Sequence, residues 1–312
     1  RQMCIRDRVW GFDFQLLDGY AYIVGYGLEI ADIGNPQKPK VISTMGTSGI
    51  ATSIKIQDGY GYIAGQQGGL VIADISDKNR PKIIARQRTV GTTVDVVRNE
   101  NRVYLANGLD GLHIVVVTNL HQPKWVEHFK GSGKPTDFCV ENEKIYVTTA
   151  SSLKVINKQN KAIHLDIEVG ISVSAKDDHA YVAVGKSGII VYDLRNLQRP
   201  IEITRIPTPL PAINIQINED LLYICAGDII ILDISSPQNI RRIGKIQMSG
   251  TAYRLAFEDD LVYVAALTDG VRVFNVLNPA NPRPISGYQM DGNALGVAVK
   301  DSRAYILDSD IG

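Results

Sequence analysis

Residues 54–74 read IKIQDGYGYIAGQQGGLVIAD, and variants of this arrangement recur along the chain, which makes it the strongest indication of the fold. Two short apolar segments are joined by the turn Asp58-Gly59, and a third segment, Leu70–Asp74, follows a glycine-rich loop. Acidic residues beside Gly or Asn favour tight reversals, and short apolar segments between such turns are typical of antiparallel strands. The stretch therefore predicts a meander of short strands.

A tyrosine in the second predicted strand sets the period of the repeat. Successive copies lie 35 to 42 residues apart, by subtraction of their positions. The eight copies are Tyr22, Tyr62, Tyr104, Tyr146, Tyr181, Tyr223, Tyr263 and Tyr305. A period of about 40 to 45 residues that contains several short strands is the signature of a β-propeller blade.

Two columns of residues precede the tyrosines and define the first strand. The residue eight positions before each tyrosine is apolar, and the residue nine positions before it is small or polar. This two-residue alternation predicts a strand whose faces meet different environments. After the third strand, a proline-bearing loop such as that at Pro81 leads to an outer strand such as Lys82–Ala85. Proline cannot donate to a sheet ladder, so it suits this loop, and four strands make one blade.

The predicted fold class is all-β: a β-propeller of four-stranded antiparallel blades, with seven full repeats and half of an eighth, and so seven or eight blades. We expect a single propeller domain over residues 9–312 that is truncated at its C-terminus, because Leu307–Gly312 stops where a third strand should start. Residues 1–8, RQMCIRDR, fit no column and look like a translated sequencing adapter at the edge of a metagenomic fragment. The fourth repeat is the shortest, and we expect its outer strands to be reduced.

Composition excludes several classes of protein. Lys plus Arg and Asp plus Glu each number 33, so the formal charge is zero, which disfavours a nucleic acid binder. Cys4, Cys139 and Cys225 lie far apart and form no CxxC pair, so neither a zinc knot nor a dense disulfide framework is expected. Apolar runs such as Leu221–Ala226 are far shorter than the roughly 20 residues of a transmembrane helix, and no transmembrane segment is predicted.

Three stretches resemble a known family. Leu70–Ser76 reads LVIADIS, Ile231–Pro237 reads ILDISSP and Asn278–Pro282 reads NPANP. They look like the LVIVD repeat, a bacterial β-propeller repeat that is named for its third-strand motif and continues into a proline-rich loop. The resemblance extends from about residue 9 to the end, although some copies are degenerate, with Val116 in place of the aspartate in the third repeat. It implies a secreted or cell-surface location outside the cytoplasm.

The polar column nine positions before the tyrosines is the first candidate binding site. First strands surround the axis of a propeller, and a ring of carboxylates there can hold a cation such as calcium through oxygen ligands. The column consists of Asp13, Ser53, Asp95, Asp137, Ser172, Asn214 and Arg254. The alternative is that these residues bond adjacent blades or trapped water.

The loops between second and third strands are the second candidate, an interaction face, because function on scaffolds usually lies in variable loops. This face includes Tyr26, Gln66, Gln67, Asp110, Lys186, Asp228 and Asp269, with the interblade segments around Lys134, Pro209 and Met290.

Other conspicuous residues are interpreted as structural. The tyrosine column is expected to pack in the core. The aspartates that end third strands are expected to cap turns; they are Asp32, Asp74, Asp193 and Asp233. No GxSxG motif occurs, and the histidines show no zinc-binding spacing; they are His113, His121, His128, His164 and His179. No catalytic residue, metal ligand or cofactor is therefore assigned.

The sequence favours a non-catalytic, monomeric propeller that acts as a rigid scaffold for an unidentified protein or a surface glycan. The alternative is a hydrolase-like or lactonase-like propeller with a cation in the central channel, held by Asp13, Asp95, Asp137 and Asn214. The sequence leans toward the first hypothesis and leaves enzymatic activity open.

Overall fold

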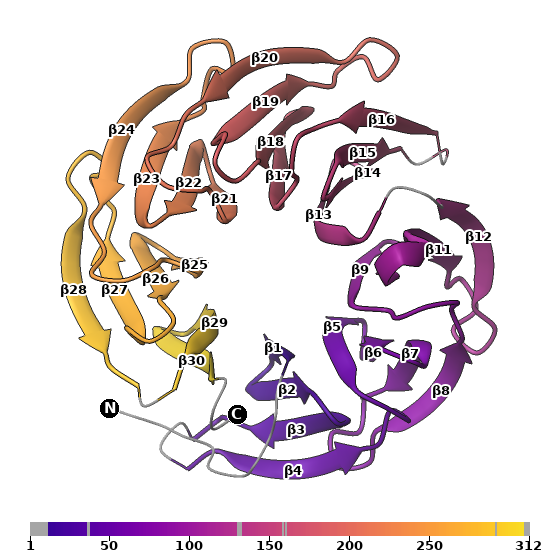
Figure 1. Ribbon diagram of the computed structural model, residues 1–312. Coiled ribbons are helices and arrows are strands. Elements are labelled where there is room, and N and C mark those ends of the chain that lie inside the picture. The colour runs from indigo at the N-terminus through magenta and orange to yellow at the C-terminus, as the bar shows by residue number, and fades with distance from the viewer. Residues whose placement is uncertain are drawn as a thin grey trace. The chain divides into compact units, whose positions relative to one another are not determined.

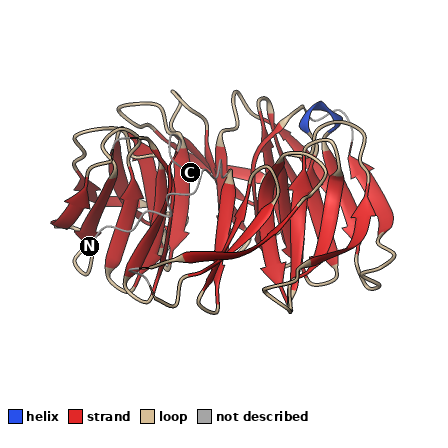
Figure 2. Ribbon diagram, turned by 90° about the horizontal axis from the view of Figure 1, so that it is seen from below, coloured by secondary structure: helices blue, strands red, loops and turns tan. Residues whose placement is uncertain are grey.

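The predicted all-β class is confirmed in a computed structural model, which describes residues 12–35, 38–129, 133–157, 159, 161–290 and 292–308. Strands and connecting loops make up nearly all of this part of the chain, and its one helix is the short 3-10 turn η1 (Gly108–Asp110) (Figure 2). The adapter-like segment, residues 1–8, lies outside the described residues. No described helix has the length and hydropathy of a membrane span.

The strands fall into two compact units, and the first holds three four-stranded antiparallel sheets (Figure 1, indigo to magenta). Its strands are β1 (Asp13–Leu17), β2 (Tyr20–Val24), β3 (Leu28–Asp32), β4 (Lys40–Met45), β5 (Ala51–Gln57), β6 (Tyr60–Gly65), β7 (Gly69–Asp74), β8 (Lys82–Gln87), β9 (Asp95–Asn99), β10 (Arg102–Ala106), β11 (Leu112–Val116) and β12 (Lys124–Phe129).

The second unit holds four more four-stranded antiparallel sheets, each with its strands paired in sequence order. Its strands are β13 (Pro135–Glu141), β14 (Lys144–Thr149), β15 (Ser152–Ile156), β16 (Ala162–Asp166), β17 (Ser172–Lys176), β18 (His179–Ala183), β19 (Ile189–Asp193), β20 (Ile201–Ile206), β21 (Asn214–Asn218), β22 (Leu221–Ala226), β23 (Asp228–Asp233), β24 (Arg241–Ile246), β25 (Arg254–Glu258), β26 (Leu261–Ala265), β27 (Val271–Asn275) and β28 (Arg283–Tyr288).

The turn between the first two strands of a sheet forms as its chemistry predicts. Gln57 pairs with Tyr60, which leaves a two-residue turn at Asp58 and Gly59. The φ angles of these two residues are 55° and 79°. A type I′ hairpin requires positive φ at both central positions, and Asp-Gly adopts this conformation readily. The turn fixes the register of the hairpin and places Tyr62 at a constant position in it.

Apolar clusters between neighbouring sheets form the core of each unit. In the first unit, one cluster joins the first and second sheets around Tyr22 and Ile54, and another joins the second and third around Tyr62 and Val96. In the second unit, clusters join each successive pair of four-stranded sheets. Seven of the eight phased tyrosines are at most 6% exposed, and Tyr305 is half-buried. The predicted packing role of this column is confirmed for those seven.

In most four-stranded sheets, a β-bulge interrupts the pairing between the third strand and the fourth, outer strand. Between β11 and β12 the register shifts by one residue at Ile114/Val115. Six of the seven four-stranded sheets carry this shift at the corresponding position, whereas β15 and β16 pair without one. The outer strand β16 has five residues, and the other outer strands have six. The reduction expected in the fourth repeat is therefore small.

The half-blade expected in the eighth repeat is not supported. The last two strands, β29 (Ala294–Lys300) and β30 (Arg303–Asp308), form only a two-stranded sheet. Residues 309–312, where a third strand was expected to begin, lie outside the described residues. Two backbone hydrogen bonds of 3.0 and 3.3 Å join Ala294 to Leu267, which lies in the loop between β26 and β27. The fold is a β-propeller with seven four-stranded antiparallel blades.

The strand order places two kinds of loop at the same edge of every sheet. These are the loops from second to third strands and the loops from a fourth strand to the next first strand. Hydrogen bonds tie them together: Ala51 N donates to Gly25 O at 2.7 Å, and Ala212 N donates to Gly185 O at 3.0 Å. We call this edge the loop face of each unit.

Candidate functional site

The polar column bridges neighbouring first strands in the first unit. Asp13 lies at the start of β1, where its Oδ1 accepts a hydrogen bond from Phe14 N at 2.9 Å. Its Oδ2 accepts hydrogen bonds from Ser53 Oγ and Ile54 N of the next sheet, at 3.1 Å each. Both carboxylate oxygens therefore have donors, and Asp13 connects the first sheet to the second.

The same arrangement recurs in the second unit at Asp137. Its Oδ1 accepts from Phe138 N at 2.9 Å, and its Oδ2 accepts from Ser172 Oγ at 2.7 Å and Val173 N at 3.0 Å. Ser172 Oγ in turn accepts a long hydrogen bond of 3.4 Å from Ile215 N of the following sheet. Asp13 with Ser53, and Asp137 with Ser172, thus supply hydrogen bonds from blade to blade, as the structural interpretation predicted for these four residues.

Burial affects two carboxylates of this column. It raises the pKa of Asp95 and of Asp137, because desolvation disfavours a carboxylate, while hydrogen bonds from Ser53 and Ser172 act in the opposite direction. Arg254 is exposed, and its guanidinium lies 5.4 Å from the centre of the Tyr253 ring. Asn214 is 6% exposed, at the start of β21. Cation binding by the column stays a prediction.

The structure places the predicted interaction-face residues on the loop face of one unit or the other. Tyr26, Gln67, Lys134, Lys186 and Pro209 are exposed, and Gln66, Asp110, Asp228, Asp269 and Met290 are half-buried. Two of the carboxylates hold neighbouring loops together. Asp228 accepts from Met248 N at 2.8 Å and pairs with Lys245 Nζ at 2.5 Å, and Asp269 accepts from Ser249 Oγ at 2.7 Å.

The loop face also exposes large apolar side chains that sequence reasoning did not single out, apart from Tyr26. In the first unit, Phe12 is 48% exposed, Tyr26 72% and Val90 75%. In the second unit, Val169 is 46% and Leu210 55% exposed. The available signal was an apolar residue inside an otherwise polar loop, but such a residue can also fold back onto the core, and only the structure shows which occurs.

The residues interpreted as turn caps are confirmed in that role. Asp32 Oδ1 accepts from Gly34 N at 2.8 Å, and Asp74 Oδ1 accepts from Ser76 N at 2.9 Å. Equivalent bonds occur at two further third-strand ends, Asp193 and Asp233. The Cys225 thiol is buried, and burial raises its pKa to about 12. A thiol in that state is a poor nucleophile at neutral pH.

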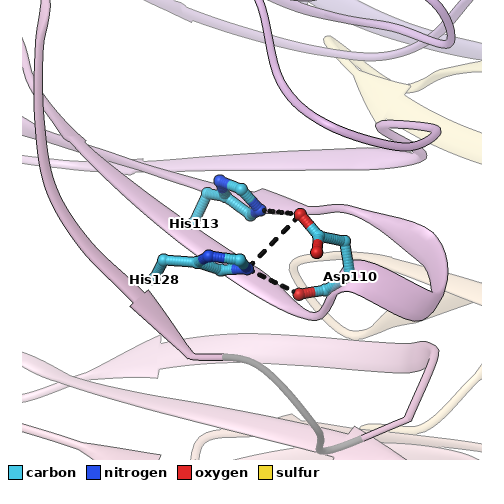
Figure 3. A group of neighbouring side chains, drawn as sticks. All are labelled: Asp110, His113 and His128. Carbon is cyan, nitrogen blue, oxygen red and sulfur yellow. Dashed lines mark hydrogen bonds and ion pairs between the residues drawn. The ribbon is translucent and has the colours of Figure 1, made fainter.

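A second polar group, which we call the Asp110 cluster, consists of Asp110, His113 and His128 (Figure 3). Asp110 ends η1, His113 follows on β11, and His128 lies directly opposite His113 on β12. His113 Nε2 is 2.8 Å from Asp110 Oδ2, and His128 Nε2 is 3.3 Å from the same oxygen and 2.8 Å from the Asp110 carbonyl. The imidazole centroids are 3.9 Å apart at an interplanar angle of 31°. Both rings thus direct Nε2 to one carboxylate (Figure 3).

The sequence did not reveal the Asp110 cluster because its pairing depends on the β-bulge. Val115 pairs with Trp125, and from that pair a regular ladder would set Glu127 opposite His113. The one-residue shift in β12 sets His128 there instead. The signal in the sequence was Asp110 three residues before His113, but neither the partner strand's register nor its face was fixed by spacing.

Comparisons with known proteins agree with the fold. A family model of the LVIVD repeat matches residues 13–47, 48–89, 171–208 and 211–246. No curated protein gives a significant sequence match.

Solved structures with the same fold have very different sequences. The chain resembles the computationally designed protein Ika8, with 12% identity, a TM-score of 0.79, and coverage of 98% of this chain and 96% of Ika8. It resembles Sqt1 of Saccharomyces cerevisiae with 13% identity, a TM-score of 0.79, and coverage of 97% of this chain and 94% of Sqt1. It resembles BamB of Moraxella catarrhalis with 11% identity, a TM-score of 0.70, and coverage of 96% of this chain and 91% of BamB. At these identities the likeness establishes the fold alone.

Proposed function

We propose that the chain, an LVIVD-repeat β-propeller, is a non-catalytic scaffold that binds another protein through its loop face. The observation that carries this proposal is the exposure of the Tyr26 and Val90 side chains, at 72% and 75%, on loops of the first unit and outside its apolar clusters. Large apolar groups in water favour burial against a partner, and aromatic side chains often dominate the energy of such interfaces.

The distribution of the remaining residues supports this proposal. Tyrosines and aliphatic residues pack the blades, the third-strand aspartates cap turns, and Asp13 and Asp137 join neighbouring blades. The loop face carries variable side chains on a rigid set of strands, which is where binding residues are commonly found on repeat scaffolds. We propose further that the scaffold is monomeric and acts in a secreted or cell-surface setting.

A cation-dependent hydrolase is the alternative, with the ion held by the polar column. Against it, both oxygens of Asp13 and of Asp137 already accept hydrogen bonds from the chain. A calcium ion needs six to eight oxygen ligands and would compete with these donors for the carboxylate oxygens. A surface glycan is the other candidate ligand for the loop face.

Matched variants test the binding proposal. Tyr26→Ser removes a 72% exposed side chain from the loop face, and Leu277→Ser removes a 70% exposed side chain from a loop between third and fourth strands, at the opposite sheet edge. The proteins are immobilised and incubated with an extract of the cells that produce them, and retained proteins are quantified after crosslinking. We expect wild type and Leu277→Ser to retain the same protein and Tyr26→Ser to lose it by about tenfold or more.

Equal retention by all three proteins, or selective loss in Leu277→Ser, would contradict a loop-face interface. Binding to a glycan array that is abolished by Tyr26→Ser, without protein retention, would assign the face to glycans instead. Turnover of a substrate that depends on Asp137 and an added cation would replace the scaffold with the hydrolase.

A further inference from the structure

We infer that the Asp110 cluster is a binding site for a divalent transition-metal ion, with Zn²⁺ the best match. The ligand atoms are Nε2 of His113, Nε2 of His128 and Oδ2 of Asp110, and atoms of these three side chains lie within 4.8 Å of one another. Asp110 also lies on the loop face, whereas His113 and His128 lie on β11 and β12, and the inference does not depend on the proposed protein binding.

The distances fit an ion between the three side chains. Tetrahedral ligands at about 2.1 Å from Zn²⁺ are about 3.4 Å from each other. His128 Nε2 lies 3.3 Å from Asp110 Oδ2, so this pair already has the required separation. His113 Nε2 lies 2.8 Å from the same oxygen, and this distance has to widen by about 0.6 Å to match tetrahedral coordination.

The surroundings position the ligands and leave access for an ion. The His113 side chain is 6% exposed, the Asp110 side chain 19% and the His128 side chain 29%. The Trp125 ring packs edge-on against His113 at 4.9 Å. The buried histidine is therefore held in place, and an ion can enter beside His128. Three protein ligands leave at least one coordination position for water or for a group from a partner.

The donor atoms select the class of metal. Two imidazole nitrogens and one carboxylate oxygen suit Zn²⁺ and neighbouring transition metals, whereas Ca²⁺ and Mg²⁺ require mainly oxygen ligands. Each imidazole must present an unprotonated Nε2 to the ion, so the ring proton moves to Nδ1 when the ion replaces the hydrogen bonds to Asp110.

The cluster is specific to the third sheet among the described blades. In the other six four-stranded sheets, the third-strand and fourth-strand residues that correspond to His113 and His128 cannot provide two imidazoles. These pairs are Glu29 with Thr44, Val71 with Arg86, Lys154 with His164, Ile190 with Arg205, Ile230 with Lys245, and Arg272 with Gly287. The repeat architecture therefore does not require two histidines and an aspartate here.

Metal titration of the purified 312-residue chain tests the inference. The protein is stripped with a chelator, titrated with ZnCl₂ by calorimetry, and titrated separately with CoCl₂ while visible absorption and tryptophan fluorescence are recorded. Trp125 is one of two tryptophans and contacts His113, so bound Co²⁺ should quench its emission. We expect saturable binding of one ion per chain and a Co²⁺ absorption spectrum typical of tetrahedral coordination.

Three variants locate the ion. Asp110→Asn preserves side-chain size, and His128→Ala changes the more exposed histidine; each should weaken binding by about tenfold or more. His164→Ala is the matched control, because His164 Nε2 also lies beside a carboxylate, at 3.1 Å from Asp166 Oδ1, on an outer strand. It should leave the affinity unchanged.

Absence of saturable binding by wild type up to about 1 mM Zn²⁺ would overturn the inference, as would equal affinity in wild type and Asp110→Asn. If circular dichroism shows that His128→Ala does not fold, Asp110→Asn decides alone. Weakening by His164→Ala, with Asp110→Asn unaffected, would place the ion at the other histidine and refute the assignment.

Discussion

Replacement of Asp137 by alanine should destabilise the protein by removing the hydrogen bonds between the first strands β13 and β17. Three donors lose their acceptor: Phe138 N at 2.9 Å, Ser172 Oγ at 2.7 Å and Val173 N at 3.0 Å. A buried donor left without an acceptor costs about 1–3 kcal/mol. Burial of the Asp137 carboxylate is itself unfavourable, because desolvation raises its pKa. Removing the carboxylate removes this penalty and so offsets part of the lost stability. We expect a net loss of about 2–4 kcal/mol in the free energy of unfolding.

Urea unfolding followed by circular dichroism measures this change. Asp166→Ala is the control, because the Asp166 side chain is 95% exposed on β16 of the same sheet, and its stability should match wild type. Added Ca²⁺ should not stabilise wild type, because both Asp137 oxygens are already bonded within the protein. The reasoning fails if Asp137→Ala unfolds at the wild-type urea concentration. It also fails if Ca²⁺ stabilises wild type and not Asp137→Ala, which would favour a cation site in the polar column.

Three further predictions concern the repeated blade. Tyr223 Oη is buried without a hydrogen-bond partner among the described residues, so Tyr223→Phe should change stability by less than about 0.5 kcal/mol and Tyr223→Ala should cost about 3–5 kcal/mol in urea unfolding. Gly188 has φ of 80°, and an added Cβ would meet the backbone oxygen of Ile206; Gly188→Ala should therefore cost about 1–3 kcal/mol, and an unchanged midpoint would contradict this. Burial raises the pKa of Tyr22, Tyr181 and Tyr223 to about 12, above the ordinary value of 10.0. A tyrosine whose pKa is higher in the folded than in the unfolded state contributes stability that is present below pH 10 and is lost as the pH rises toward 12. The urea concentration at the unfolding midpoint should therefore fall over that pH range, together with the rise of phenolate absorbance. A midpoint that stays constant to pH 12 would refute the burial argument.

The candidate sites were only partly visible in the sequence. The polar column could be read from its spacing before the tyrosines, and the structure shows that Asp13 bonds Ser53 and Asp137 bonds Ser172. Spacing could not show which carboxylate oxygens already have donors, because those donors come from a sheet about 40 residues away. Exposure of Tyr26 likewise depends on how its loop sits on the blade.

Local chemistry along the chain is enough to specify the blade. Turns such as Asp58-Gly59 and the two-residue alternation act over a few residues, so strand order, hairpin register and the buried position of Tyr62 follow from local chemistry. The Asp110 cluster, in contrast, depends on pairing between two strands. The one-residue bulge sets His128 rather than Glu127 opposite His113, and this register belongs to the pairing of β11 with β12, which residue spacing within either strand does not record.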